Sequence, residues 1–366
     1  MNVKTVELHL LQSFPPSCVN RDGNNSPKDC MFGDARRARI SSQCLKRAIR
    51  QADSFAETVG EAIADRSKQM RDKKLIPYLL HKGLSQQDAE KHADDFRRAL
   101  AKDDKKPNLT SVGLYFGDQE LFSLLDAFRG GEKKWKQKGT RKSADVCLFG
   151  RMLVEATDLN VDAAAQVAHA ISTHKLSQEM DYWTAADDLK DRSEGEDAGA
   201  GMLGTAEFNA SLFYRYACIN LDQLSRNLAE KSENGEWPNG SELTARTVEA
   251  FLLASYDAIP TGKLNGHAHF SPPIFALAVV RKKGMPLNLC NAFLDPVSAR
   301  NSKRLGIASA CALLDHLKRM RTMVPMDEAT YLMAHALPEA PTPADGVTVL
   351  NGYRSLIQKV TEELQK

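Results

Sequence analysis

The sequence predicts an α+β protein in which a small sheet core carries inserted segments. Strand-like and helix-like segments alternate through the first and last parts of the chain, which is typical of this fold class. From about residue 55 to 158 the composition changes to Ala, Asp, Lys, Arg and Leu with few β-branched runs, which favours a helical insertion. At 366 residues, 42% of them hydrophobic, the chain can bury one large elaborated domain or two smaller ones.

The N-terminal part begins with a strand, predicted over residues 3–12. Apolar residues there alternate with polar ones, so the two sets face opposite ways: Val6, Leu8 and Leu10 against Glu7 and His9. The Pro, Gly and Asn residues of 15–29 predict a long loop.

The remaining elements follow the helical insertion. We expect strands at 167–174, 212–221 and 274–281, and helices at 244–257, at about 298–321 and from about 350 onward. Between the first two of these strands, the acidic, glycine-rich stretch 187–204 is a candidate hairpin. The Pro-rich piece 338–343 is predicted to be a linker, and no internal repeat occurs.

Charge is segregated along the chain although the net charge is only +2. Residues 21–50 hold eight basic and three acidic residues, and residues 129–142 hold seven basic and one acidic residue. Residues 281–304 carry +5, whereas residues 179–197 carry −6. Such blocks suit an elongated anion on some surfaces and a protein neighbour on others, although each is also typical of a solvated face.

The most informative block is the basic helix predicted to start at Ser41 or Ser42 and to end near Ala52. At 100° per residue, its apolar residues lie on one face, and its polar and cationic residues lie on the other. The apolar set is Leu45, Ala48, Ile49 and Ala52, and the opposite set is Gln43, Lys46, Arg47 and Arg50.

Three arginines, Arg36, Arg37 and Arg39, lead into the N-terminus of this helix. Free backbone N–H groups, hydroxyl groups and guanidiniums at one place suit a phosphate backbone. An ordinary amphipathic helix with a charged outer face explains the same pattern.

Several functional classes are disfavoured by the sequence. Seven scattered cysteines without a CxxC pair argue against disulfides and zinc, and a reducing cytoplasmic location fits them. No secretory signal, membrane span, GxGxxG, P-loop, GxSxG or HExxH occurs, and no cofactor is expected. His267 and His269 are a possible metal pair on a strand without an obvious third ligand, while His169 and His174 are expected to be structural.

Long segments of the chain resemble the CasC family of the RAMP superfamily, the backbone subunit of the type I-E CRISPR Cascade complex. The resemblance is carried by segments in family order: PSCVNRD at 16–22, KDCMFGDARRARISSQCLKRA at 28–48, DVCLFGRM at 145–152, AHAISTHKLSQEMDYWTAADDL at 168–189, LGTAEFNASLFYRYACINL at 203–221 and, more weakly, MPLNLCNAF at 285–293. These segments are distributed over most of the chain.

The resemblance implies a right-hand architecture. A ferredoxin-like (RRM-type) palm would comprise residues 1–54 and 208–366, with helical fingers at 55–166. The palm-to-thumb segment, including a β-hairpin thumb, would comprise residues 167–207. Copies of the chain would stack head-to-tail along a guide RNA and present it for pairing with target DNA in antiviral defence.

The resemblance also implies residue roles. The guide-contacting stretch matches Lys28, Arg37, Arg39, Ser41, Gln43 and Lys46, with Arg21 nearby and Arg47 and Arg50 added from helix geometry. Phe208 matches an aromatic thumb residue that wedges beside a displaced base, with Met202 and Leu203 as its support. A DNA-holding finger surface matches Lys133, Lys134, Lys136 and Lys138 by location.

The implied partners are the CRISPR guide RNA, target DNA, further copies of the chain and other Cascade subunits, with no membrane. The other Cascade subunits would include large, small, guide-end-capping and RNA-processing subunits. The expectation is therefore a protein that is not an enzyme. Two alternatives stay open: a RAMP-type endoribonuclease using Asp34, and a monomeric single-stranded RNA-binding module.

Overall fold

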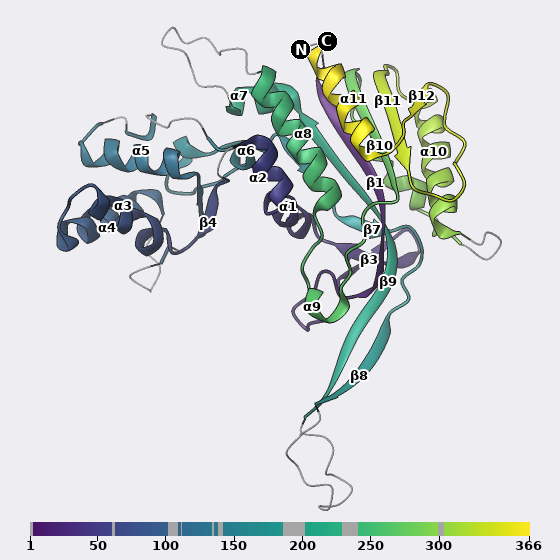
Figure 1. Ribbon diagram of the computed structural model, residues 1–366, viewed down its shortest axis with the longest axis horizontal. Coiled ribbons are helices and arrows are strands. Elements are labelled where there is room, and N and C mark those ends of the chain that lie inside the picture. The colour runs from purple at the N-terminus through teal and green to yellow at the C-terminus, as the bar shows by residue number, and fades with distance from the viewer. Residues whose placement is uncertain are drawn as a thin grey trace, which may run out of the picture.

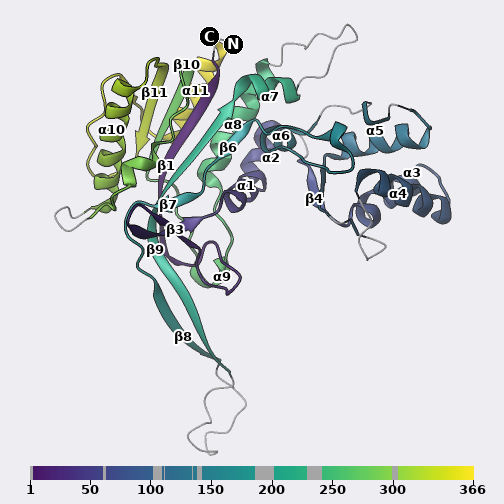
Figure 2. The ribbon, with the colours of Figure 1, turned by 180° about the vertical axis from the view of Figure 1, so that it is seen from behind.

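The structure is a computed structural model that describes residues 3–60, 63–101, 109–110, 112–133, 135–137, 142–185, 202–228, 241–298 and 304–366. It is an α+β protein in which a large mixed sheet carries a lobe on one side and a long projecting hairpin below (Figures 1 and 2). The lobe is formed by the helical insertion, and we call it the finger lobe. The two ends of the chain lie close together at the opposite end of the sheet from the hairpin (Figure 1). None of the described helices is long and apolar enough to cross a lipid bilayer.

The strands form one ten-stranded and one two-stranded sheet within the described residues. The large sheet has the order β12-β11-β10-β1-β9-β7-β3-β2, and β6 and β8 also pair with β9. The strands are β1 (Thr5–Ser17), β2 (Asp29–Phe32), β3 (Ala35–Ile40), β4 (Asp65–Ser67), β5 (Leu114–Phe116), β6 (Ala165–Val167), β7 (Ala170–Ser172), β8 (Glu179–Ala185), β9 (Met202–Asn220), β10 (Phe275–Lys283), β11 (Glu328–His335) and β12 (Val347–Val349).

The α-helices are α1 (Ser42–Arg50), α2 (Asp53–Val59), α3 (Ile76–His81), α4 (Gln86–Leu100), α5 (Asp118–Arg129), α6 (Ala144–Phe149), α7 (Leu221–Leu228), α8 (Ser241–Asp257), α9 (Leu264–His267), α10 (Leu305–Met323) and α11 (Tyr353–Gln365). A π-helix, η1 (Arg71–Leu75), precedes α3. Within the described ranges there are also three short 3-10 helices: η2 (Trp135–Gln137), η3 (Thr157–Leu159) and η4 (Leu289–Phe293).

Most predicted elements are confirmed, including the helical insertion and the strand–helix alternation around it. The first strand is longer than predicted and continues to Ser17. The hairpin candidate is confirmed only at its stem, where β8 pairs with the start of β9, because residues 186–201 lie outside the described part. The prediction of a long loop at 15–29 is confirmed for residues 18–28 and wrong at its two ends, which belong to β1 and β2. Its second half is an ordered turn in which Asp22 Oδ1 accepts hydrogen bonds from the backbone N–H groups of Asn24 and Ser26.

The central strand β1 is buried on both faces because helices cover both sides of the sheet. Its residues Val6, Leu8 and Leu10 share one apolar core with Phe251 of α8 and Val360 of α11. On the opposite face, Leu11 packs in a second core with Leu277 of β10 and Leu313 of α10. The predicted alternation is therefore correct, but its polar face is covered by protein.

The polar residues on this second face form a buried network. Glu7 accepts hydrogen bonds from Arg281 Nε at 2.7 Å and from the backbone N–H of Leu287 at 2.6 Å. Arg281 Nη1 continues to Asp327 at 2.8 Å, and the hydroxyl of Tyr331 donates to the same carboxylate. A buried charge is tolerated only when it is paired in this way, so the network fixes β1 against β10 and β11.

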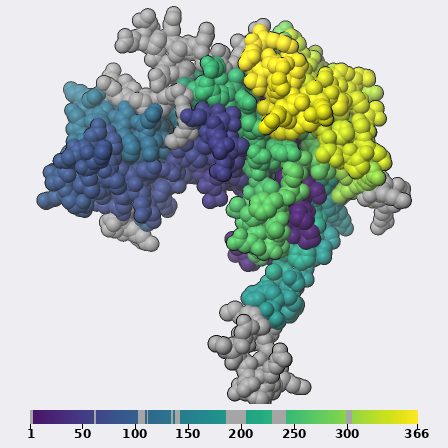
Figure 3. All heavy atoms as spheres, viewed as in Figure 1, coloured from purple at the N-terminus to yellow at the C-terminus, as the bar shows by residue number. Residues whose placement is uncertain are grey.

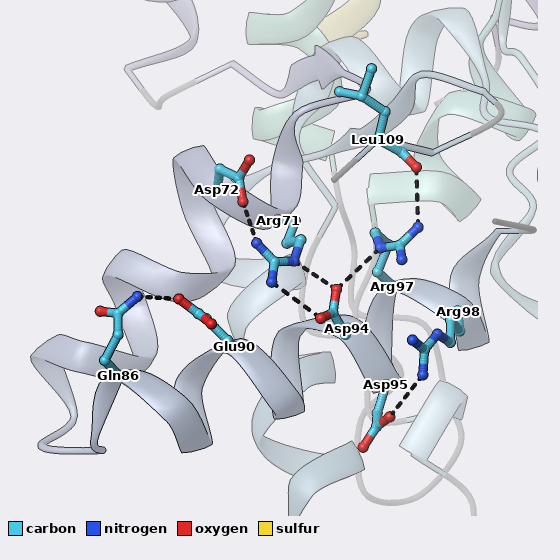
Figure 4. Close-up of polar contacts among 9 residues, drawn as sticks. All are labelled: Arg71, Asp72, Gln86, Glu90, Asp94, Asp95, Arg97, Arg98 and Leu109. Carbon is cyan, nitrogen blue, oxygen red and sulfur yellow. Dashed lines mark hydrogen bonds and ion pairs between the residues drawn. The ribbon is translucent and has the colours of Figure 1, made fainter. Parts of the chain in front are cut away.

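The finger lobe has its own apolar core and projects from the sheet (Figure 3). A bidentate ion pair ties its π-helix to α4, because Arg71 contacts both oxygens of Asp94 at 2.6 and 3.1 Å (Figure 4). Partial burial opposes ionisation of Asp94, but the hydrogen bonds from Arg71 lower its pKa overall. Buried Arg97 donates a hydrogen bond to the carbonyl of Leu109, so polar as well as apolar contacts stabilise the lobe (Figure 4).

The buried imidazole of His9 predicts a pH-dependent stability. Burial, and next the charge of Arg281, lower the pKa of His9 from 6.5 to about 3. A lowered folded-state pKa gives stability that is complete above pH 6.5 and is lost as the pH falls toward 3. Between pH 7.5 and 4.5 this one group should remove about 3 kcal/mol from the free energy of unfolding.

Over the same pH interval, the free energy of unfolding of the His9→Asn variant should fall by about 3 kcal/mol less than that of the wild type, because asparagine does not titrate. Asparagine keeps a polar atom near the position of Nδ1, which lies 2.9 Å from the hydroxyl of Tyr214. Urea unfolding at the two pH values measures the difference. Equal losses in the two proteins would contradict a neutral, buried His9.

Candidate nucleic-acid interface

The basic segment of the sequence folds as an edge hairpin followed directly by α1. Strands β2 and β3 pair from Asp29 to Ala38, and β3 joins the large sheet through two residue pairs with β7. Ser41 then caps α1, because its side-chain oxygen accepts a hydrogen bond from the backbone N–H of Cys44 at 3.3 Å. The predicted helix start and its N-cap are thereby confirmed.

Arg37 is the residue that holds this edge in place. Its side chain is 0% exposed and donates to the carbonyl oxygens of Ser172, Phe293 and Leu294 at 3.0, 2.7 and 3.2 Å. Ser172 Oγ also accepts from the backbone N–H of Ala38 at 3.0 Å. The prediction that Arg37 contacts a ligand directly is therefore wrong in this structure, because the guanidinium is covered by β7 and η4.

Arg50 also leaves the predicted cationic face. Its Nη1 atom donates to the carbonyl of Ala64 at 2.9 Å and lies 3.6 Å from the buried carboxylate of Asp145. The guanidinium sits 5.0 Å from the centre of the Tyr115 ring, and the Tyr115 hydroxyl donates to Asp145. Arg50 thus joins α1 to the base of the fingers, which is the physical reason that it is not free for an anion.

The other predicted cations lie on α1 or on the segments beside it. Burial raises the pKa of the Cys44 thiol, while the neighbouring charges of Lys28 and Arg47 act in the opposite direction. Arg39 and Lys28 likewise act together on His169, whose pKa burial also lowers. Arg21 and Arg47 line one groove beside α1, and Lys28 and Arg39 line a hollow next to β2 and β3. We call these four residues, with Gln43 and Lys46 of α1, the α1 cationic surface.

This surface is short of counter-ions. Across the described ranges, Lys28, Arg39, Lys46 and Arg47 form no ion pair, whereas Arg36 is paired with Asp29 at 3.2 Å. Arg21 donates to the neutral side chain of Asn25 at 2.7 Å. Burial lowers the pKa of half-buried Lys46. An anion that binds there would restore the solvation that these cations lack.

His169 joins the surface, although the sequence had indicated only a structural role. Its Nδ1 atom accepts the backbone N–H of Ser42 at 2.8 Å, at the N-terminus of α1. Because the donor is a backbone amide, Nδ1 carries no proton and the neutral ring must carry its proton on Nε2. The exposed ring therefore offers a further N–H donor beside Lys28 and Arg39. No local sequence signal marks this role, because residue 169 reaches α1 only through β7.

The long hairpin is formed by β8 and the first part of β9 (Figure 1). Phe208 pairs with Glu179 where the hairpin leaves the sheet, so it lies at the base of the hairpin and not at its tip. It is half-buried, and its ring centre is 6.5 Å from that of His267. Trp183 covers Gly204, where an added Cβ atom would lie 2.3 Å from the indole.

Several other predicted site residues lie wholly or partly outside the described part of the chain. Met202 and Leu203 belong to β9, but their side chains lie outside the described part, as do Lys134 and Lys138. Lys133 is exposed after α5, and Lys136 Nζ is 5.6 Å from the Trp135 ring centre.

The histidine pair is not arranged as predicted. The segment at His267 is the short helix α9 and not a strand, and left-handed Ala268 follows it. Buried His269 hydrogen-bonds the carbonyl of Pro260 through Nε2. No group of three metal-binding side chains occurs among the residues described. His174 is structural as expected, because its Nε2 accepts the backbone N–H of Leu212.

Two solved structures define the class of protein to which this fold belongs. A chain titled "CRISPR RNA-guided surveillance complex, pre-nicking" is similar with a TM-score of 0.82 and 26% identity, over 98% of this chain and 100% of that chain. A chain titled "CRISPR RNA-guided surveillance complex" has a TM-score of 0.64 and 24% identity, over 98% and 99% of the two chains, and shows the fold alone.

The family follows from the sequence itself. The model of the CT1975-like protein family matches residues 6–361, and the chain belongs to this family. No curated protein matches this chain. The family match runs through the sheet, the fingers and the hairpin alike, so these parts belong to one protein type.

The position of Arg37 predicts a loss of stability when its hydrogen bonds are removed. Arg37→Met keeps an unbranched side chain but places apolar atoms against three carbonyl oxygens, and should lower the free energy of unfolding by about 3 kcal/mol. The matched control is Arg36→Met, next in the chain but exposed, which should change it by about 0.5 kcal/mol or less. Equal effects in urea unfolding would show that Arg37 is not an anchor.

Proposed function

We propose that the chain is a CasC-type backbone subunit of a type I-E Cascade complex, which binds guide RNA in several copies and presents it to target DNA. The observation that carries the proposal is the α1 cationic surface, whose cations form no ion pair with a carboxylate among the described residues and lie on α1 or beside it. Such a surface suits sugar-phosphate contacts that do not depend on base sequence. The similarity to chains titled as CRISPR RNA-guided surveillance complexes supports it.

A ferredoxin-like palm is part of this proposal. In chain order, β1, α1, β7, β9, α8 and β10 follow the β-α-β-β-α-β pattern of that fold. Their order in the sheet is β10-β1-β9-β7 with antiparallel neighbours, which is the ferredoxin-like arrangement 4-1-3-2. The fingers are then an insertion between α1 and β7, and the hairpin is an extension between β7 and β9.

The hairpin supplies the thumb of this proposal. Phe208 at its base, beside His267, would pack against a base displaced from the guide. A guide carrying 2-aminopurine reports on such displacement, because its fluorescence changes when the base unstacks. Phe208→Ala should change the signal at regular positions while RNA loading is kept, and unchanged signals at every position would remove Phe208 from this role.

The chain is proposed to bind RNA without cutting it. Asp34 is an exposed carboxylate in the β2–β3 turn, and in the part of the chain described it belongs to no group of metal-binding side chains. Metal-dependent cleavage of complementary RNA that disappears in Asp34→Ala would overturn this part of the proposal and make the protein a ribonuclease.

The phosphate contacts are tested through salt dependence. Lys46→Gln should weaken RNA binding for all sequences alike and should lower the slope of log K against log salt by about 0.7, because one fewer counterion is released from a single strand. Fluorescence anisotropy of labelled guides across a range of salt concentrations measures the slope. The control is Lys318→Gln on α10, an exposed lysine on the other side of the sheet, which should leave it unchanged.

If the slope of log K against log salt is as steep in Lys46→Gln as in Lys318→Gln and the wild type, Lys46 is not a phosphate ligand. A smaller slope for Lys318→Gln alone would place the RNA on the α10 face and would contradict the proposed surface.

A further inference from the structure

A groove of about 760 Å³ lies beside the α1 cationic surface, between α1 and the segment that follows α8. Its volume falls within the range of small-ligand sites in proteins. Arg47 and Arg21 line it from the α1 side, and Asp257 and Phe270 line it from the other. The groove is therefore continuous with the proposed RNA surface, since Arg47 belongs to both.

The aromatic ring of Phe270 is presented to solvent by a fixed backbone. Its side chain is 71% exposed, although His269 before it is fully buried and the carbonyl of Ser271 after it accepts a hydrogen bond from Gln12. An isolated exposed phenylalanine is ordinary on a protein surface. Here both neighbours are anchored, so the backbone that carries the ring is fixed at this position.

The segment that carries Phe270 also holds unusual backbone conformations. Lys263 and Ala268 have φ angles of 50° and 46°, in the left-handed region that non-glycine residues rarely adopt. Gly262 lies so close to the segment that follows β1 that an added Cβ would be 2.3 Å from the carbonyl oxygen of Val19. Strained residues that persist because their surroundings fix them are frequent at ligand sites.

The polar lining points to the chemistry of the occupant. Ser54 is one of the lining residues, and its Oγ atom is buried without a hydrogen-bond partner among the described residues. Asp53 and Asp257 add carboxylate acceptors, which suit base amino groups and ribose hydroxyls but repel phosphate. Phosphate is left to the guanidiniums of Arg21 and Arg47, which line the same groove.

We propose that this groove binds one nucleotide of the guide RNA in each copy of the chain, with its base stacked on Phe270. Its phosphate would lie against Arg21 and Arg47, and its amino or 2′-hydroxyl group would donate to Asp53 or Asp257. The proposal rests on the proposed RNA-binding function and adds a nucleotide site outside the hairpin. A segment of a second copy is the other conceivable occupant, but two guanidiniums continuous with the cationic surface favour RNA.

Photochemical crosslinking of the RNA-bound complex tests the site. Guides carrying 5-iodocytidine at one position at a time are irradiated, and crosslinked peptides are identified by mass spectrometry. We expect a crosslink to Phe270 at guide positions that recur once per copy. Phe270→Tyr, which keeps the ring, should retain it, and Phe270→Leu should reduce its yield about tenfold at equal RNA content.

The outcomes separate this inference from the proposed function. RNA-loaded complexes without any crosslink to residue 270, or with a crosslink that persists in Phe270→Leu, overturn the nucleotide site alone. A Phe270→Leu variant that loses copies from the complex, without any RNA crosslink in the wild type, assigns the groove to a neighbouring chain and also overturns it. Complexes that contain no RNA overturn the proposed function itself.

Discussion

The arrangement of the functional surface depends on one buried guanidinium. Strand β3 shares only two residue pairs with β7, too few to hold an edge strand firmly. Arg37 extends this attachment by donating to carbonyl oxygens of β7 and of the η4 region, and Ser172 adds a side-chain hydrogen bond. Because α1 begins two residues after β3 ends, whatever holds β3 also sets the position of the helix N-terminus and of the cations around it.

The protein uses its arginines in two ways. Arg151 and Arg281 are buried and paired with Glu120 and Glu7, each with a contact of 2.7 Å, and they stabilise the fingers and the sheet. Among the described residues, the cations on the α1 cationic surface form no such ion pair, although Arg21 and Arg39 each donate one hydrogen bond to a neutral group. In the proposed function this surface would bind the repeating backbone of RNA, and the adjacent groove would add an aromatic ring for one base.

The sequence predicted elements whose signals are local. The alternation of Val6 and Leu8 with Glu7, and the hydroxyl of Ser41 before an amphipathic helix, were sufficient because each depends on neighbours within one turn or strand. The inward turn of Arg37 was not predictable from the run ARRAR, in which three arginines look alike. It depends on a strand that is 135 residues away in the chain and on the η4 segment, 256 residues away. The roles of Arg50 and His169 are likewise set by Asp145 and by the N-terminus of α1, which only the tertiary fold brings near.

The central claim is that identical copies of this chain assemble along an RNA through the α1 cationic surface. Native mass spectrometry of the complex, reconstituted with guides of two lengths, tests it most directly. The longer guide should carry more copies of the chain, each added with a constant increment of RNA length. The same number of copies on both guides, or an assembly of unchanged mass without RNA, would contradict it.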